Sequence, residues 1–264
     1  MIFMSHHIMA QKKTTTIHIL NADKANYDER LGKNVQRLIG NVVMRQDSTY
    51  FYSDSAYYNE KTKFFDGFGN VHIKVNDSTD IYSKLLKYNG ETRFAELFHD
   101  VILKDDSTIL NTEYMTYDRV GHLASYPNHG TITRNDKKLV SKKGYYRDDI
   151  KVVYFRTDVV GTMPDYKILS DTLVYDTENE MMYFYGPTTM INKENTLYGN
   201  YGWYNTETEL AYLDKRATLK NKEQSMIADT MFYNKKTGYA KALNDVIIED
   251  TVYKATLTGN YAEM

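Results

Sequence analysis

The sequence predicts an elongated, antiparallel all-β fold built from two-strand repeats of about 29 residues. Tyrosine returns at Tyr58, Tyr88, Tyr117, Tyr146, Tyr175, Tyr204 and Tyr233, with spacings of 30, 29, 29, 29, 29 and 29 residues. The 264 residues include 25 Tyr and only 3 Pro, a bias typical of pleated sheet because Pro cannot donate to a strand ladder. No stretch keeps a helical period, so each unit is predicted to be strand, turn, strand, turn.

Each element of the unit has its own recurring residues. A large apolar residue stands seven positions before each tyrosine, beginning with Leu20 before Tyr27, and Asn-rich turns follow the tyrosine. The second strand starts at motifs such as Gly40-Asn41-Val42 and continues with alternating apolar residues that share one face. The residues predicted to line the interior are Val42, Met44, Phe51, Val71, Ile73, Ile81, Val101, Leu103, Leu110, Leu139, Ile168, Leu197 and Met226. The recurring tyrosine is expected to pack its ring and to place its hydroxyl at the rim.

A shift of parity inside the first strand predicts a bend. A column of small residues, such as Ser53, shares the face of the large apolar column. Three and five residues after it, however, the apolar positions have moved to the other parity, as at Ala56 and Tyr58. A one-residue shift turns side chains to the opposite face unless the strand carries a bulge. Repeated bends would fold the meander into two facing sheets around a trough, with charged residues such as Asp54 capping the corner. The small column comprises Ser53, Ser83, Thr112, Ser141 and Ser170.

Two interpretations of the trough stay open at this point. The small column either lets the sheets close on a dry core, or leaves a seam that admits long apolar chains. Periodicity alone does not separate them.

The sequence offers no chemistry for catalysis. A formal net charge of -2 with both signs interspersed argues against a nucleic-acid surface, and the absence of Cys excludes disulfides and zinc-thiolate sites. Neither a zinc-protease histidine spacing, a phosphate loop nor a nucleophile elbow is present. No run approaches the roughly 18 apolar residues of a membrane span. We therefore expect no enzyme activity, no cofactor and no metal.

The repeat also predicts the domain organisation. Residues 17–264 are expected to form one domain that continues beyond residue 264, because Gly259-Asn260-Tyr261 matches Gly199-Asn200-Tyr201 and the chain stops in mid-repeat. Residues 1–16 are interpreted either as the remnant of an export signal or as the product of a mis-called start.

Several registered motifs resemble the OstA/LptA lipopolysaccharide transport family over residues 17–264. They are Ile19-Leu20-Asn21-Ala22-Asp23-Lys24-Ala25, the returning Gly-Asn-Val, and Ser53-Asp54-Ser55-Ala56-Tyr57-Tyr58. The resemblance implies a β-jelly-roll, or β-taco, in the periplasm that holds lipid acyl chains in its groove and joins end to end. This chain is longer than a compact member, and its repeats between residues 131 and 188 lose the Gly-Asn-Val motif at Gly130-Thr131-Ile132 and Gly186-Pro187-Thr188.

The predicted function is therefore a periplasmic lipid-binding bridge that carries lipopolysaccharide toward the outer membrane. The sequence leaves open whether the protein is also associated with the outer membrane. Its expected partners are lipopolysaccharide or a similar glycolipid, other envelope transport components, and a second copy through the end strands. The alternative is a structural or adhesive scaffold with a closed core. A carbohydrate-active enzyme is a remote alternative, since no carboxylate cluster interrupts the repeat.

Overall fold

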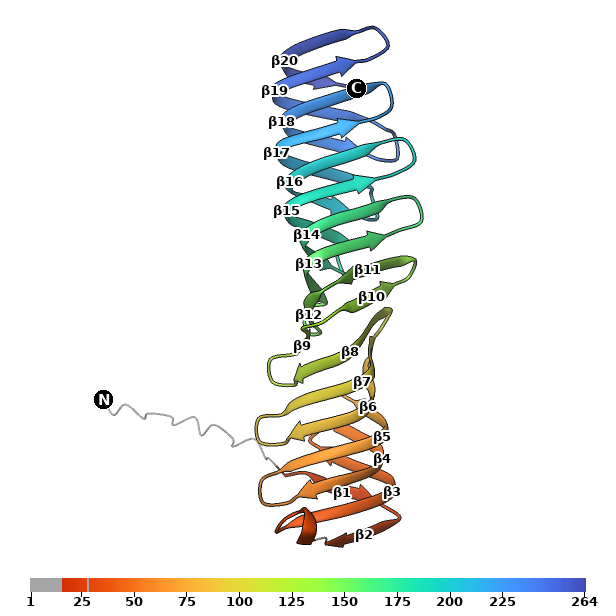
Figure 1. Cartoon of the computed structure of the whole chain (residues 1–264), viewed down its shortest axis with the longest axis vertical. Helices are drawn as coiled ribbons and strands as arrows, with labels where there is room; N and C mark the ends of the chain where they lie inside the picture. The colour runs from red at the N-terminus through yellow and green to blue at the C-terminus, as the bar shows by residue number, and fades with distance from the viewer. Residues whose placement is uncertain (1–15, 28) are drawn as a thin grey trace, which may run out of the picture.

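Antiparallel strands stack into one elongated column that runs from the N-terminal end to the C-terminal end of the chain (Figure 1). The structure is a computed structural model that describes residues 16–27 and 29–264. The export-signal interpretation concerns residues that lie, except for residue 16, outside this range.

The described residues form 20 strands and one short 3-10 helix, in the order β1 (His18–Asn21), β2 (Lys24–Tyr27), η1 (Glu29–Leu31), β3 (Val35–Gln46), β4 (Thr49–Asn59), β5 (Phe64–Lys74), β6 (Thr79–Asn89), β7 (Phe94–Asp105), β8 (Thr108–Asp118), β9 (Leu123–Tyr126), β10 (Gly130–Arg134), β11 (Lys137–Ser141), β12 (Lys143–Arg147), β13 (Val152–Thr162), β14 (Lys167–Asp176), β15 (Met181–Ile191), β16 (Thr196–Asn205), β17 (Leu210–Lys220), β18 (Gln224–Asn234), β19 (Ala240–Asp250) and β20 (Ala255–Glu263). Each long strand pairs with the next one along the chain. Three of the strands are interrupted, and each forms two short strands that pair with one common neighbour. Thus β1 and β2 both pair with β3, β9 and β10 both pair with β8, and β11 and β12 both pair with β13.

The hairpin turns are built as the sequence chemistry predicts. In the turn after β4, the side-chain Oδ1 of Asn59 accepts hydrogen bonds from the backbone N–H groups of Lys61 and Thr62, at 3.0 and 3.1 Å. Asx turns of this kind tighten a hairpin without help from other elements. Lys63 then closes the turn with φ of 58°. The same pattern starts at Asn89, Asp118, Asp176, Asn205 and Asn234.

A bulge in the middle of alternate strands produces the predicted bend. In β5, Gly69 and Asn70 both adopt left-handed backbone, with φ of 68° and 41°, and the pairing register shifts between Phe68 and Val71. The neighbouring strand caps the corner, since Asn70 Nδ2 donates to Asp54 Oδ2 at 3.0 Å. Comparable pairs of left-handed residues occur at Gly40 and Asn41, His99 and Asp100, Thr157 and Asp158, Lys215 and Arg216, and Asn244 and Asp245.

The bends turn the two halves of each strand toward each other. Phe51, in the first half of β4, packs its ring 4.7 Å from that of Tyr88 and 5.1 Å from that of Phe65, and both partners lie on the other side of the bend. Aromatic rings at these separations are in direct contact. The predicted fold class, an elongated antiparallel β-jelly-roll or β-taco of two-strand repeats, is confirmed.

Two details of the predicted register are wrong. Leu20 is 48% exposed because Ile19, not Leu20, pairs with Met44. The motif aligned at Gly130-Thr131-Ile132 is displaced: Gly130 pairs with Thr112, the partner that Val101 has in β7. The corner of that repeat therefore falls on His129, whose φ is 51°.

The left-handed corner makes a direct prediction for Gly69→Ala. A Cβ at Gly69 would collide with the Asp54 carboxylate and would also occupy unfavourable backbone, so we expect the variant to lose about 1 to 3 kcal/mol of unfolding free energy. Gly67→Ala is the control, because its Cβ would meet only ordinary contacts, the nearest at 3.5 Å. Urea denaturation measures both, and equal stability of the two variants would contradict the role of the bend.

Candidate functional site

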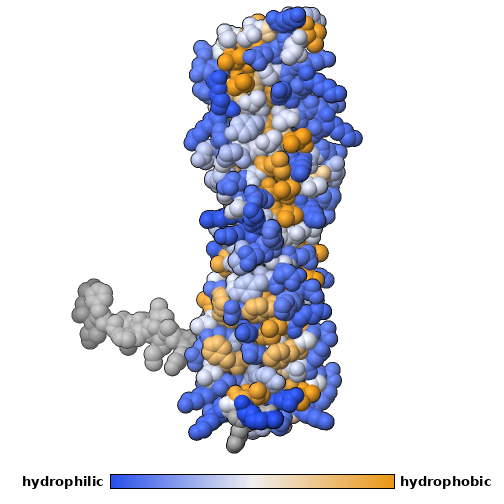
Figure 2. All heavy atoms as spheres, in the orientation of Figure 1, coloured by the Kyte–Doolittle hydropathy of each residue, from blue (hydrophilic) through white to orange (hydrophobic). Residues whose placement is uncertain are grey.

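The residues predicted to line the groove all lie inside the roll. Each of the thirteen is at most 3% exposed, and Ile81, Leu103 and Leu110 are completely buried. A side chain without exposure touches no space large enough for a water molecule, so this column is tightly packed. On the face seen in Figure 2, polar residues cover most of the surface and hydrophobic residues form scattered patches. The interior is therefore closed in this structure, and whether lipid enters it stays a prediction.

The small column lies at the bend, where its hydroxyl groups stabilise the corner. Ser83 Oγ donates to the backbone carbonyl of Leu85 at 3.1 Å, two residues along the same strand. A bulge disrupts the ladder locally, so a side-chain donor can satisfy a carbonyl there. The same bond to the residue two positions later is made by Ser53, Thr112, Ser141 and Ser170. This role is structural, and contact with a ligand at these positions stays a prediction.

Opposite the bend, the two series of hairpin turns face each other along a line that we call the mouth. One series includes the turns at Asp47 and Asp106, and the other includes the turns at Gly90 and Lys151. The mouth is bridged by side chains, for example by an ion pair of 2.8 Å between Arg93 and Asp47. Clusters of such contacts hold it closed, among them three around Gln46, Asp105 and Glu180.

The first cluster surrounds Gln46, a fully buried residue at the end of β3. Its Oε1 accepts from the Tyr88 hydroxyl at 2.5 Å and from Arg119 Nη1 at 3.0 Å, and its Nε2 donates to the Gly90 carbonyl at 2.7 Å. Arg119 also donates to Thr49 Oγ1 at 2.6 Å. Buried polar groups are nearly always hydrogen-bonded, and here the hydrogen bonds of Gln46 run from one edge of the mouth to the other. The cluster therefore holds the two edges together.

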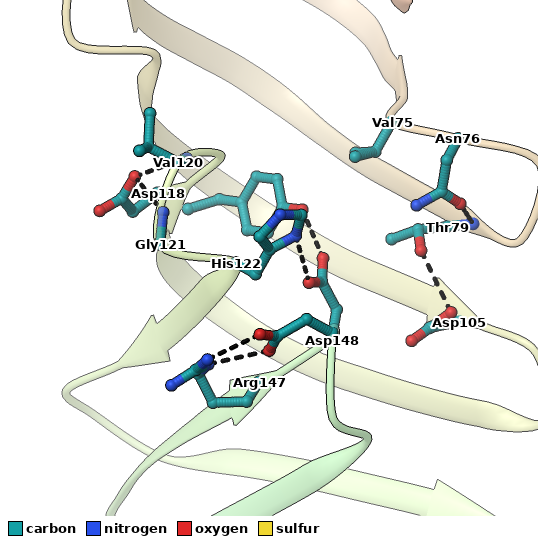
Figure 3. A network of polar contacts seen from close by, with 12 residues as sticks. Val75, Asn76, Thr79, Asp105, Asp118, Val120, Gly121, His122, Arg147 and Asp148 are labelled. Atoms are coloured by element: carbon teal, nitrogen blue, oxygen red, sulfur yellow. Dashed lines mark hydrogen bonds and ion pairs between the residues drawn. The ribbon is translucent and has the colours of Figure 1, made fainter. Parts of the chain in front are cut away.

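The second cluster surrounds Asp105, which is 1% exposed. Its carboxylate accepts from the Tyr146 hydroxyl and from Lys151 Nζ across the mouth, each at 2.6 Å. It also accepts from Thr79 Oγ1 beside it at 3.1 Å, the contact drawn in Figure 3. Burial, helped by the adjacent Asp105 charge, raises the pKa of Tyr146, so its hydroxyl stays a donor. Figure 3 also shows His122 beside Asp148, joined to it at 3.0 Å on the other edge.

The third cluster surrounds Glu180, at the end of the turn after β14. Arg134 and Lys137 reach its carboxylate across the mouth, at 3.4 and 3.2 Å, and the hydroxyls of Tyr175 and Thr206 donate to it at 2.6 Å each. Burial acts to raise the pKa of Glu180, but the hydrogen bonds from Thr206, Tyr175 and Lys137 and the Lys137 charge outweigh it and lower the pKa to about 2. The carboxylate is thus charged at neutral pH and binds both cations.

Sequence reasoning missed these mouth residues, although a signal was present. Gln46, Asp105 and Arg134 each continue an inward-facing alternation by one further step, as in Val42, Met44 and then Gln46. A polar residue at an inward position beside a turn indicates a buried polar contact at the edge of the core.

Comparisons with known proteins show the family to which the chain belongs. The OstA-like protein family model matches residues 14–171 and 167–229. The chain belongs to the OstA-like protein family. No curated protein sequence matches it significantly. Among solved structures, this OstA-like chain is similar to LptH of Pseudomonas aeruginosa, described as the LptA-homologous periplasmic component of the lipopolysaccharide transport device, with 19% identity and a TM-score of 0.34 over 39% of this chain and 76% of that one. Within the described residues of this OstA-like chain, no helix is long and apolar enough to cross a membrane.

Glu180 makes the closure of the mouth sensitive to acid. A carboxyl whose pKa is lowered by folding stabilises the folded state fully above its unfolded pKa, and this contribution is lost as pH falls toward the folded value. We therefore expect the stability advantage of the natural chain over Glu180→Gln to shrink between pH 4.5 and about pH 2. Urea denaturation across this range measures it, with Glu178→Gln on the same turn as the control. An advantage that does not change with pH would contradict the assignment.

Proposed function

We propose that this OstA-like chain is a periplasmic lipid-binding bridge that carries the acyl chains of lipopolysaccharide in its interior toward the outer membrane. The observation that carries the proposal is the unbroken apolar column, which runs through the repeats from Val42 to Met226 and is shielded on both sides. Its family membership supports the ligand and the compartment. The chain binds and releases without chemistry, so no cofactor takes part.

Lipid entry requires the mouth to open, since the interior is packed. Opening at the bend would break strand ladders, whereas opening at the mouth separates side-chain contacts worth about 0.5 to 1.5 kcal/mol each, or about 1.5 to 3 kcal/mol where a partner is charged. An acyl chain gains about 0.8 kcal/mol for each methylene it buries, or about 8 kcal/mol for ten. Burial of one chain therefore offsets the loss of several mouth contacts. The sugar and phosphate groups stay outside.

Photo-crosslinking in cells tests whether lipid occupies the interior. A photoreactive residue at Leu110, which is fully buried, is expected to crosslink to lipopolysaccharide, whereas the same residue at the exposed Lys104 on the neighbouring strand is not. An antibody to lipopolysaccharide detects the product.

The packed interior also favours a second candidate, a structural or adhesive scaffold whose core never opens. The crosslinking experiment separates the two. Folded protein that yields no lipid adduct at Leu110 would contradict the carrier and support the scaffold.

The end strands are proposed to join copies of the chain head to tail. Among the described residues β20 pairs only with β19, and Leu257, which lies opposite the inward-facing Ile248, is 64% exposed. An unpaired strand edge with exposed apolar residues is a template for another strand. We expect light scattering to show a mass that falls on dilution, and Leu257→Glu to give monomers at all concentrations. Val120→Glu, in an exposed hairpin turn, is the control, and equal behaviour of both variants would contradict joining at β20.

A further inference from the structure

The outer face of the C-terminal half carries a row of aromatic side chains. We call it the aromatic strip. It crosses β12 to β18, the green to blue part of Figure 1, and its members are directly opposite one another in successive strand pairs, with Val174 as the one aliphatic member. The aromatic members of the strip are Tyr145, Tyr154, Tyr183, Trp203, Tyr212 and Phe232.

The repeat itself does not require aromatic residues at these positions. The same row continues through the pairing of Ser125 with Tyr145 into the N-terminal half, where it is mostly charged or polar. Its members there are Arg37, Tyr57, Asp66, Lys87, Glu96, Thr116 and Ser125. Since both halves fold in the same way, the aromatic strip is a local feature with a cause other than the fold.

One end of the strip forms a cleft of about 510 Å³. Tyr145, Tyr154, Tyr183 and Tyr185 line it, and the rings of Tyr145 and Tyr154 stack 4.4 Å apart with an angle of 15°. Tyr185 is 53% exposed. Within the described part of the chain, none of these four hydroxyls makes a hydrogen bond, in contrast to those of Tyr88, Tyr146 and Tyr175 in the buried tyrosine column. The cleft thus offers flat apolar rings and free hydroxyl groups together.

Arg156 lines the cleft, and among the described residues neither it nor its cross-strand neighbour Lys143 has a carboxylate partner. Lys143 and Arg156 lie directly opposite each other on β12 and β13, and both are exposed. Like charges in this position destabilise a strand pair. The guanidinium of Arg156 lies 6.0 Å from the centre of the Tyr145 ring, and neither cation forms an ion pair among the described residues. The Asp176 carboxylate at the other side of the cleft already accepts hydrogen bonds from its own turn. An anionic ligand group would relieve the repulsion.

We propose that this cleft binds an acidic saccharide, namely the phosphate-bearing sugar part of the lipopolysaccharide whose acyl chains enter the roll. The tyrosine rings stack on the apolar faces of the sugars, the free hydroxyls bond to sugar oxygens, and Arg156 with Lys143 holds the anion. That the saccharide belongs to lipopolysaccharide rests on the proposed function. That the cleft binds an acidic saccharide does not, since the cleft lies on the outer face and is separate from the interior.

Calorimetric titration of the full chain with fully deacylated lipopolysaccharide saccharide tests the proposal without involving the interior. We expect Arg156→Gln and Tyr185→Ala each to weaken binding about tenfold or more, while Tyr114→Ala, an outer-face tyrosine of the N-terminal half, leaves it unchanged. Tyr185 makes no aromatic ring contact with another described residue, so its variant should fold normally, which circular dichroism checks. Enzymatic removal of the phosphates should abolish the effect of Arg156→Gln.

Absence of saccharide binding, or equal binding by all three variants and the natural chain, would overturn the proposal. Equal affinity for the dephosphorylated saccharide would overturn the requirement for an anion. The outcome is separable from that of the proposed function: lipid crosslinked at Leu110 without saccharide binding removes only the cleft, whereas saccharide binding without any crosslink removes only the acyl-chain carrier.

Discussion

The left-handed bulge at the middle of alternate strands is the constraint on which the rest of this structure depends. Two consecutive residues with positive φ, such as Gly69 and Asn70, turn the strand so that its two halves face each other. Side chains of the two neighbouring strands support this region. The Asp54 carboxylate accepts a hydrogen bond from Asn70, and the Ser83 hydroxyl donates to the Leu85 carbonyl of its own strand. Because the bend recurs once in every pair of strands, the halves form two continuous walls around one apolar column.

At the bend the two walls are joined by the continuous strands themselves, whereas at the mouth they are joined by side-chain hydrogen bonds and ion pairs. The recurring tyrosine joins the two environments, since its ring packs in the core while its hydroxyl reaches the polar contacts at the edge, as Tyr146 does with Asp105. Side-chain contacts of this kind can be broken one at a time, whereas a strand ladder holds a whole wall together. The proposed entry of lipid therefore requires only the contacts at the mouth to separate, while the strand ladders at the bend stay intact.

The period, the strands, the turns and the interior column were all predictable from the sequence, because they depend on contacts within one repeat or between neighbours. The bend followed from the change of parity between Ser53 and Ala56. The mouth did not, because its partners lie about 40 residues or more apart, as for Gln46 and Tyr88, and their pairing depends on how far the two walls are offset. Leu20 was misplaced for a similar reason, since a single register shift at the first strand moves the inward position to Ile19.

The most direct test of the account is the width of the mouth with and without lipopolysaccharide. The chain contains no Cys, so spin labels can be attached to introduced cysteines at Ser48 and Glu91, exposed turn residues on opposite edges beside the Asp47–Arg93 ion pair. Pulsed electron paramagnetic resonance should show that this distance lengthens when lipid binds. The distance between labels at Ser48 and Ser78, which lie on the same edge, should stay constant. Lipid binding with an unchanged distance across the mouth would contradict the account.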